Sequence, residues 1–416
     1  MNKENKIPLI RFKGYTEDWE QRKLGEMSLL ITKGTTPINK SGEGTINFIK
    51  IENINADNGE IIPEMKISED EHNGYLKRSQ LQENDILFSI AGTLGRVSTV
   101  KSSILPANTN QALAIIRIKD GVLNYITTVL KGNAVTDFIK KNPTVGAQPN
   151  LSLEQVGNLE IPYPILSEQT KIGTYFQSLD NLITLHQRKC ESLKKVKKSM
   201  LQKMFPKNGE SVPEIRFAGF TDPWEQRKLG EMMNVTSVKR IHQSDWTSSG
   251  VRFLRARDIV AAFKNEEPSD YLYISEEKYN EYSSLSGKVK IGDLLVTGVG
   301  TIGVPMLINS EKPLYFKDGN IIWFQNGNEI DGDFFYYSFT GNSIQNFIQE
   351  SAGTGTVGTY TIDSGKKTPI VLPQDIAEQQ KIGSYFQSLD NLITLHQRKV
   401  EKLKNIKKSM LQKMFV

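Results

Sequence analysis

Two long stretches of the chain carry apolar side chains at the spacing of a helix that packs along a seam. From Ile172 to Met204, the seam positions recur at alternating steps of four and three residues, and the same steps run from Ile382 to Met414. Alternating steps of this kind are the heptad pattern of a coiled coil. We therefore predict two helices of about 35 residues, each roughly 50 Å long at 1.5 Å per residue.

These two predicted helices are close copies of each other. The run YFQSLDNLITLHQRK occurs at 175–189 and again at 385–399, and residues 168–205 and 378–415 differ at six aligned positions. A helix of this length needs tertiary partners, and the obvious partner is the other copy. Because a globular region separates the two copies in the chain, we expect them to form an antiparallel pair.

The apolar stripe is wider than a two-helix seam needs. Leu182, Leu185 and Val196 flank the seam of the first copy, and Leu392, Leu395 and Ile406 flank that of the second. Either further helices from a partner or the globular regions of this chain cover these positions. The residues expected to pack on the other helix or on a partner subunit are Phe176, Leu179, Leu182, Ile183, Leu185, Leu193, Phe386, Leu389, Leu392, Ile393, Leu395 and Leu403.

Outside the helices, the pattern changes to short runs rich in β-branched and aromatic residues. ILFSIAG, LAIIRIK, VRFLRA, DLLVTGV and NIIWFQN are typical of strands, whereas 124–140 and 333–349 are each typical of one or two helices. This mixture predicts α+β domains with a largely antiparallel sheet. The two globular regions open on similar runs, at 10–27 and 215–232, and are only loosely alike beyond them.

The chain is therefore a duplication, with two pseudo-twofold-related globular domains separated by the antiparallel pair of long coiled-coil helices. We place the globular domains at 1–165 and 213–375 and the helices at 166–206 and 376–416. The run PKNGESVP supplies a linker at 207–212. Near-identical helices suit two copies of one partner, whereas divergent globular domains suit two different ligands. A recent duplication alone would explain why the two helices are alike. It does not explain why the two globular domains have diverged much further than the helices.

Composition and charge narrow the class of protein. The chain has 416 residues and a single cysteine, so no internal disulfide can form, which fits a reducing cytoplasm. No run has the ~20 apolar residues of a membrane span. Each helical copy carries a net charge of +5 and the whole chain +5, so the remaining segments together carry −5. The KKVKK run of the first helix fits either a solvated helix face or a phosphate contact.

The sequence does not point to catalysis. Gly298–Gly303 and Gly353–Gly358 fit the GxGxxG spacing, but a strand-like run follows the first, so we interpret both as hairpin or loop glycines. There is no phosphate-binding GxxxxGK[ST] loop, no GxSxG run and no Cys/His cluster with metal-ligand spacing. We predict no catalytic residue and no metal site.

Polar, glycine-rich loops beside basic strands are the remaining candidates for a function. Arg, Asn and Gln can read base edges, and Thr and Tyr suit phosphates and methyl groups. The candidate DNA-binding residues are Lys33, Thr35, Asn108, Asn110, Gln111, Gln148, Asn150, Arg252, Arg255, Arg257, Thr354, Thr356 and Tyr360.

The chain resembles the specificity subunit of type I restriction–modification systems. The runs that carry the resemblance are WEQRKLGEM, present twice, NDILFSIAGTLG with GDLLVTGVGTIG, and EQxKIGxYFQSLDNLITLHQRK, also present twice. The resemblance covers essentially the whole chain and implies two target-recognition domains, each reading half of a bipartite sequence in double-stranded DNA. It further implies that the helices space these domains and bind two modification (methyltransferase) subunits.

By this resemblance the chain is a non-catalytic, cytoplasmic subunit of a multisubunit restriction endonuclease and adenine-N6 DNA methyltransferase. S-adenosylmethionine, ATP and Mg are expected on partner subunits, none of them in this chain, and restriction (motor-nuclease) subunits are expected to join. One alternative is a tandem β-rich protein that binds a glycan or a protein and is held by an internal coiled coil. Another is a nucleotide-dependent enzyme that uses the GxGxxG loops.

Overall fold

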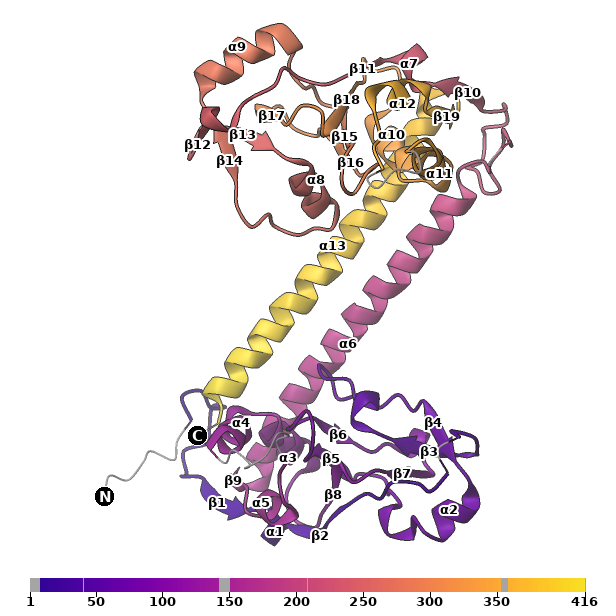
Figure 1. Ribbon diagram of the computed structural model, residues 1–416. Helices are drawn as coiled ribbons and strands as arrows, with labels where there is room; N and C mark the ends of the chain where they lie inside the picture. Colours follow the sequence, from indigo (N-terminus) through magenta and orange to yellow (C-terminus); the bar gives the residue numbers. More distant parts are fainter. Residues whose placement is uncertain (1–7, 40, 142–149, 208, 353–357, 416) are drawn as a thin grey trace. The chain divides into compact units, whose positions relative to one another are not determined.

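The computed structural model describes residues 8–39, 41–141, 150–207, 209–352 and 358–415. The chain forms two compact units, and unit 1 is built from two segments that are far apart in the sequence. Unit 1 contains Met1–Arg188 and His396–Val416, and unit 2 contains Lys189–Leu395. Each unit thus combines one globular domain with the first part of one long helix and the last part of the other (Figure 1).

The two long helices are present where the heptad pattern predicts them. Helix α6 spans Leu166–Lys203 and helix α13 spans Ile376–Lys413. Pro206 follows the end of α6 and cannot continue a helix. Within unit 1 the two helices run antiparallel, because Phe176 contacts Phe415 while His186, further along α6, contacts His396.

Unit 1 contains a four-stranded, a three-stranded and a two-stranded sheet. Strands β3 and β7 pair in parallel, and the other strand pairs are antiparallel. In sheet order the strands are β2 (Ser28–Lys33), β8 (Leu113–Ile118), β5 (Ile86–Ser89) and β6 (Val97–Thr99); β4 (Met65–Ile67), β3 (Ile46–Ile49) and β7 (Ala107–Thr109); and β1 (Glu20–Lys23) with β9 (Glu160–Tyr163). The short helices are α1 (Leu24–Met27), η1 (Ile51–Asn53), α2 (Glu69–Asn73), η2 (Lys77–Ser79), η3 (Ser102–Ile104), α3 (Leu123–Leu130), α4 (Asn133–Lys141) and α5 (Leu153–Gly157).

Unit 2 repeats this arrangement with one further short strand, and here β13 and β17 form the parallel pair. In sheet order the strands are β11 (Asn234–Thr236), β18 (Ile321–Gln325), β15 (Leu294–Thr297) and β16 (Pro305–Leu307); β12 (Trp246–Thr247), β14 (Leu272–Ile274), β13 (Val251–Leu254) and β17 (Leu314–Phe316); and β10 (Glu225–Lys228) with β19 (Pro369–Leu372). The short helices are α7 (Leu229–Met232), η4 (Gln243–Asp245), α8 (Ala256–Phe263), α9 (Glu276–Ser286), α10 (Gly332–Phe339), α11 (Asn342–Ser351) and α12 (Ile362–Lys367). The α+β class, the predicted strands and the two helical segments are confirmed.

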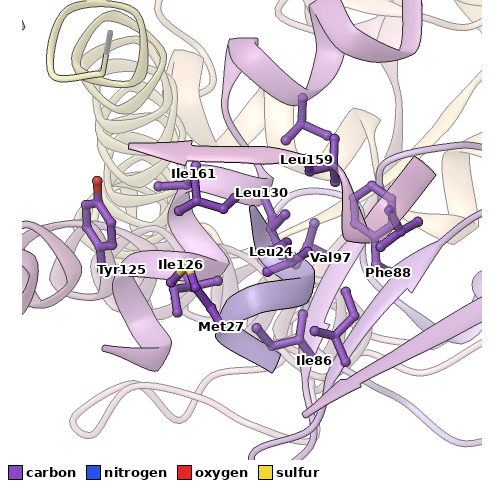
Figure 2. Close-up of a cluster of buried hydrophobic side chains, with 14 of the residues drawn as sticks. Leu24, Met27, Ile86, Phe88, Val97, Tyr125, Ile126, Leu130, Leu159 and Ile161 are labelled. Carbon is purple, nitrogen blue, oxygen red and sulfur yellow. The ribbon is translucent and has the colours of Figure 1, made fainter. Parts of the chain in front are cut away.

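Strands β8 and β18, which are inner strands of two equivalent four-stranded sheets, are apolar on both faces because each face covers a separate core. In β8, Ala114 and Ile116 belong to the core beneath α6, whereas Leu113 and Ile115 belong to the core shared with the three-stranded sheet. Strand β18 divides its side chains between two cores in the same way. The alternation follows from the two-residue period of a strand. Figure 2 shows part of the first core, including Leu24, Ile86, Phe88 and Ile161.

The end of a long helix closes the main core of each unit. In unit 1, Met414 is buried, and the ring of Phe415 lies 5.8 to 6.3 Å from those of Trp19, Tyr125 and Phe176. The backbone N–H of Ile10 donates to the carbonyl of Lys413 at 2.9 Å and so satisfies one of the last carbonyls of α13. In unit 2 the end of α6 does the same. Met204 is buried, Phe205 packs against the core, and the N–H of Ile215 donates to the Lys203 carbonyl.

A buried ion pair ties the opening segment of unit 1 to the first turn of α6. Arg11 Nε and Nη2 donate to Glu168 Oε1 and Oε2 at 2.7 and 2.8 Å, and the Trp19 indole N–H donates to Oε2 at 3.2 Å. The Glu168 side chain is fully buried. Hydrogen bonding to Glu168 raises the pKa of Arg11. In unit 2, Arg216, Glu378 and Trp224 form the same group, which we call the Arg–Glu–Trp clasp.

A glycine near the start of each long helix allows another helix to approach closely. A Cβ atom on Gly173 would lie 2.8 Å from the backbone nitrogen of Tyr125 in α3. A Cβ atom on Gly383 would lie 2.8 Å from the backbone nitrogen of Phe334 in α10. These glycines cost helix propensity, but they let the ends of the long helices pack directly on backbone.

Candidate nucleic-acid interface

Three loops meet at one end of the sheets in unit 1. The loop after β2 lies against the turn between β7 and β8, with the N–H of Gly34 donating to the Leu113 carbonyl at 3.2 Å and the N–H of Thr35 to the Thr109 carbonyl at 2.9 Å. Arg78, in η2, donates from Nε to Thr35 Oγ1 at 3.0 Å. A Cβ atom on Gly34 would lie 2.1 Å from the Thr109 carbonyl oxygen, so this close approach requires glycine.

We call this meeting point the loop junction of unit 1. It gathers four of the predicted site residues: Lys33, Thr35, Asn110 and Gln111. Lys33 and Gln111 are exposed, and Thr35 and Asn110 are half-buried. Thr36 hydrogen-bonds to Gln111 across the junction. The sequence pattern does not single out Thr36 or Arg78, because neither belongs to a motif and their neighbours come from distant segments.

Two other predicted site residues are buried. Asn108 is fully buried, and its Nδ2 donates to the Leu76 carbonyl at 2.9 Å and to Ser79 Oγ at 3.1 Å. Tyr360 is 2% exposed, its hydroxyl lies 2.6 Å from Thr368 Oγ1, and burial raises its pKa. Both side chains form part of the interior of their unit.

The remaining predicted DNA-binding residues of the glycine-rich loops lie at or beyond the edges of the described segments. Asn150 is exposed and forms an isolated bridge with Ala91. Gln148, Thr354 and Thr356 lie outside the described residues.

Unit 2 has a loop junction at the corresponding place in its sheets. The loop after β11 carries Lys239 and Arg240, and the turn after β17 carries Lys317 and Asp318. Arg240 Nε donates to Asp318 Oδ2 at 2.8 Å, and the N–H of Lys239 donates to Ser286 Oγ at 2.8 Å. The Arg240 side chain is 70% exposed, whereas that of Asp318 is 15% exposed.

Strand register shows that the two junctions occupy equivalent places. Thr32 pairs with Ile115 in unit 1, and Thr236 pairs with Trp323 in unit 2, in the same position of the sheet. Counting onward from Thr32 and Thr236 aligns Thr35 and Thr36 with Lys239 and Arg240. The parallel pairs Phe48–Asn108 and Phe253–Tyr315 likewise align Asn110 and Gln111 with Lys317 and Asp318. At the aligned positions, the Thr35 hydroxyl accepts from Arg78 Nε, whereas the Lys239 backbone N–H donates to Ser286 Oγ.

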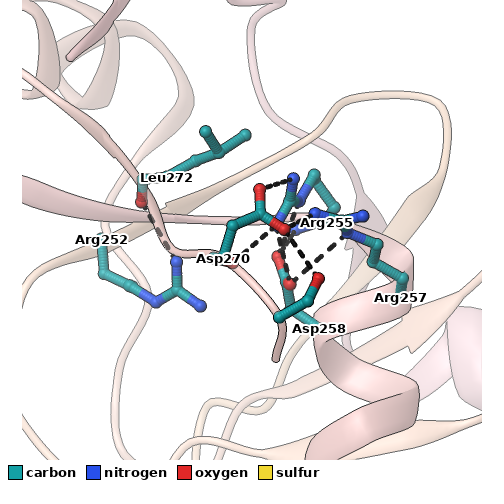
Figure 3. Close-up of polar contacts among 7 residues, drawn as sticks. Arg252, Arg255, Arg257, Asp258, Asp270 and Leu272 are labelled. Atoms are coloured by element: carbon teal, nitrogen blue, oxygen red, sulfur yellow. Dashed lines mark hydrogen bonds and ion pairs between the residues drawn. The ribbon is translucent and has the colours of Figure 1, made fainter. Parts of the chain in front are cut away.

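The three arginines predicted near β13 are held mainly by contacts inside unit 2 (Figure 3). Arg255 bonds to Asp258 and Asp270, and its backbone N–H donates to Asp258 Oδ2 at 2.8 Å, which fixes the start of α8. Arg257 also pairs with Asp270, and Arg252 lies 4.2 Å from the centre of the Tyr271 ring. Hydrogen bonding to Arg255 lowers the pKa of Asp270, which keeps this carboxylate ionised.

These contacts engage Arg255 within unit 2. Its side chain is 16% exposed and pairs with two carboxylates, and these bonds position the start of α8. Arg252 is half-buried, with Nη1 donating to the Leu272 carbonyl at 3.2 Å (Figure 3). Arg257, whose side chain is 55% exposed, is the member of the group most open to solvent.

The long helices bury the predicted seam and leave its flanks exposed. In unit 1, Phe176, Leu179 and Ile183 are buried, as are Phe386, Leu389 and Ile393 in unit 2, whereas Leu193 and Leu403 are half-buried. Polar groups also occupy the seam, with Lys197 Nζ 2.6 Å from Asp390 Oδ1 and His186 Nδ1 2.9 Å from His396 Nδ1.

Both units keep an exposed pair of leucines beside this seam. Leu182 and Leu185 in unit 1 are 43% and 49% exposed, and Leu392 and Leu395 in unit 2 are 44% and 46% exposed. The globular domains of this chain therefore do not cover them. An identical apolar pair exposed on each unit is a candidate binding face for an identical partner.

The described residues contain no arrangement that points to a reaction centre. Gly298–Gly303 joins β15 to its antiparallel neighbour β16, so this GxGxxG run is a hairpin, as predicted; Gly353–Gly358 lies mostly outside the described residues. Within the described part of the chain, no three His, Cys, Asp or Glu side chains are grouped so that they could hold a metal ion. Among the same residues, no helix has the length and apolar character needed to cross a membrane.

Comparison with known proteins gives a consistent result over nearly the whole chain. The family model described as "Type I restriction modification DNA specificity domain" matches residues 16–195 and 221–405. The MjaVIII and MjaIX type I restriction enzyme specificity subunits of Methanocaldococcus jannaschii are 25% and 26% identical to this chain. The alignments cover 95% and 96% of this chain and 91% and 93% of those proteins. The crystal structure of the type I restriction–modification S subunit from M. genitalium matches with a TM-score of 0.64 at 16% identity, covering 99% of both chains.

Proposed function

The chain belongs to the family of type I restriction–modification DNA specificity proteins, and from this premise we propose how its parts divide the work. Each globular domain reads one half of a bipartite sequence in double-stranded DNA. The helices α6 and α13 set the spacing between the two half-sites and bind two methyltransferase subunits. The chain itself is non-catalytic and directs adenine-N6 methylation, or ATP-dependent cleavage, by the partner subunits.

The observation that carries this proposal is the contrast between the repeated and the divergent surfaces. The helices are near-identical and each exposes the same leucine pair, so the chain offers one apolar face twice. The loop junctions occupy equivalent places in the strand register but have no side chain in common among Thr35, Thr36, Gln111 and their counterparts. Two copies of one partner need identical faces, whereas two different half-sites need different ones.

Two methyltransferase subunits are the occupants that best fit the exposed leucines. Burying apolar side chains that are nearly half exposed yields about 25 cal/mol per Å² of surface removed from water. A monomeric protein gains nothing by keeping such side chains identical in two copies. S-adenosylmethionine belongs to these partners, and ATP and Mg belong to the motor-nuclease subunits that join for cleavage.

The candidate DNA-contacting residues in unit 1 are the exposed Lys33 and Gln111 and the half-buried Asn110 of the loop junction. Lys33 suits a phosphate, and Asn110 and Gln111 can make paired hydrogen bonds to a base edge. Because the chain outside the helices carries a net charge of −5, DNA affinity depends on such local groups and on the partner subunits.

A domain exchange tests the division of labour. Residues 213–373 are replaced by the corresponding segment of another specificity subunit of known target, and the hybrid is co-expressed with its methyltransferase subunits. The expected result is a methylated sequence in which one half is new and the other half and the assembly are unchanged. A change in both halves, or methylation without any split sequence, contradicts the proposal.

A further inference from the structure

The loop junctions of the two units occupy equivalent places in the strand register and carry different side chains at the aligned positions. Resting on the function proposed above, we propose that each junction is the base-reading site of its unit. Arg78, with Thr36 and Gln111, makes the specific contacts in unit 1, and Arg240, oriented by Asp318, makes them in unit 2. These residues determine which base pairs each half-site contains.

The backbone of each junction is held in place before any ligand binds. In unit 1, the loop after β2 is fixed by two backbone hydrogen bonds to the β7–β8 segment and by the close approach at Gly34. In unit 2, the hydroxyl of Tyr315 in β17 donates to the Lys239 carbonyl at 2.9 Å, and the Lys239 N–H bonds to Ser286. A site fixed by the body of the domain presents its side chains with little loss of conformational entropy on binding.

The side chains at these fixed positions have the chemistry of base readout. Arginine presents a planar fork that bonds to two acceptors of guanine, and glutamine bonds in the same manner to adenine. Arg78 is exposed and uses one of its donors to bond Thr35. Arg240 is also exposed, and the carboxylate that holds its Nε is largely buried, so the outer edge of the guanidinium is left toward solvent.

Cationic and aromatic groups surround the junction of unit 2. Lys239 Nζ lies 4.7 Å from the centre of the Tyr282 ring, and Lys278 Nζ lies 4.8 Å from the same ring. Lys317 is exposed in the turn beside Asp318. Lysines placed around a central arginine suit phosphates on either side of the bases that the arginine reads.

The other basic group of unit 2 is a weaker candidate for base readout. Arg255 is neutralised by Asp258 and Asp270, and Arg257 shares Asp270 with it (Figure 3). A base that bonded to these arginines would first have to break ion pairs inside the protein. The junction needs no such rearrangement, because the Arg240–Asp318 contact leaves the outer donors of Arg240 in place.

The test uses the full chain co-expressed with its methyltransferase subunits and maps methylated adenines in the host genome. The variants are Arg78→Ala, Arg78→Lys, Arg240→Ala and Arg240→Lys. The matched controls are Lys101→Ala in unit 1 and Arg227→Ala in unit 2, both exposed side chains away from the junctions. Duplexes randomised in one half-site then give the affinity of each purified complex for each base.

The expected results separate the two half-sites. Arg78 variants relax base choice in one half of the methylated sequence and Arg240 variants in the other, with roughly 5- to 150-fold less discrimination at the affected base. The lysine variants keep the positive charge but lose the planar guanidinium. They should therefore relax base choice as the alanine variants do, but bind DNA more tightly than the alanine variants. The control variants methylate the wild-type sequence.

Two outcomes would overturn the inference that Arg78 and Arg240 read bases and would leave the proposed function unaffected. One is a wild-type chain that directs a split motif while all four arginine variants keep that motif unchanged. The other is a set of lysine variants with wild-type base choice, which would make Arg78 and Arg240 phosphate contacts. The lysine variants also decide the matter if an alanine variant fails to assemble. If the wild-type chain directs no split motif, the proposed function itself has failed.

Discussion

The Arg–Glu–Trp clasp of unit 1 supports a sharp prediction about stability. Replacing Glu168 by alanine removes three hydrogen bonds, of 2.7, 2.8 and 3.2 Å, and leaves the guanidinium of Arg11 without its counter-charge. The Arg11 side chain is only 11% exposed, so water cannot readily replace the lost carboxylate.

The size of the effect follows from this burial. Removing one partner of a buried ion pair costs about 3–5 kcal/mol, because the other partner remains as an uncompensated charge. A domain is stable by only about 5–15 kcal/mol, so this loss is a large fraction of the free energy of unfolding. The matched control is Glu20→Ala, which breaks an exposed pair with Arg22 and should cost less than about 1 kcal/mol.

Native-state hydrogen exchange measures this loss for each unit separately, which matters because a chain of two units does not unfold in one step. The free energy of opening for peptides of β9 should fall by about 3–5 kcal/mol in Glu168→Ala, with peptides of β19 in unit 2 as the internal reference. The double variant Arg11→Met/Glu168→Leu should recover most of the loss, since it buries neither charge. If Glu168→Ala costs no more than Glu20→Ala, the clasp does not hold the opening segment, and the reasoning fails.

Three further predictions test other parts of the structure. Phe415→Ala should destabilise unit 1 by about 3 kcal/mol in the same exchange assay, because its ring closes the core at the end of α13; a loss below about 1 kcal/mol would contradict this role. Burial, together with the charge of Asp390, raises the pKa of Tyr336 to about 12, so the stability gained from the neutral phenol is full below pH 10 and is lost as the pH rises through about 12. The midpoint of urea unfolding should therefore fall less steeply over this pH range in Tyr336→Phe than in the wild-type chain. An unchanged slope would contradict this role of Tyr336. Leu185→Glu should leave the urea midpoint within error but weaken co-elution with the methyltransferase subunit, whereas equal co-elution would remove this leucine from the binding face.

The sequence predicted the parts of the fold that depend on local periodicity. The heptad spacing located α6 and α13 in the chain, because a seam residue at every third or fourth position has few alternative structures. The apolar runs located β5, β8, β13, β15 and β18 for a similar reason, since each lies in a sheet with its side chains buried. The two helices of 124–140 and of 333–349 followed from the same kind of pattern.

The grouping of the chain into units could not be predicted in the same way. The closing of unit 1 by Phe415 depends on contacts between residues nearly 400 positions apart, which leave no local pattern. The same limit applies to the site. Residue type alone could not distinguish Asn108, which is buried against Leu76 and Ser79, from Asn110, which is half-buried in the loop junction. Arg78 and Arg240 become candidates only when the strand register aligns the two units.

The most direct measurement is a genome-wide map of methylated adenines in cells with and without this gene, the methyltransferase gene being kept in both. Our account predicts a methylated sequence of two specific halves separated by a fixed number of unspecified base pairs, present with the gene and absent without it. Methylation that persists unchanged after deletion, or a continuous motif with no spacer, would contradict the central claim that this chain selects a bipartite target.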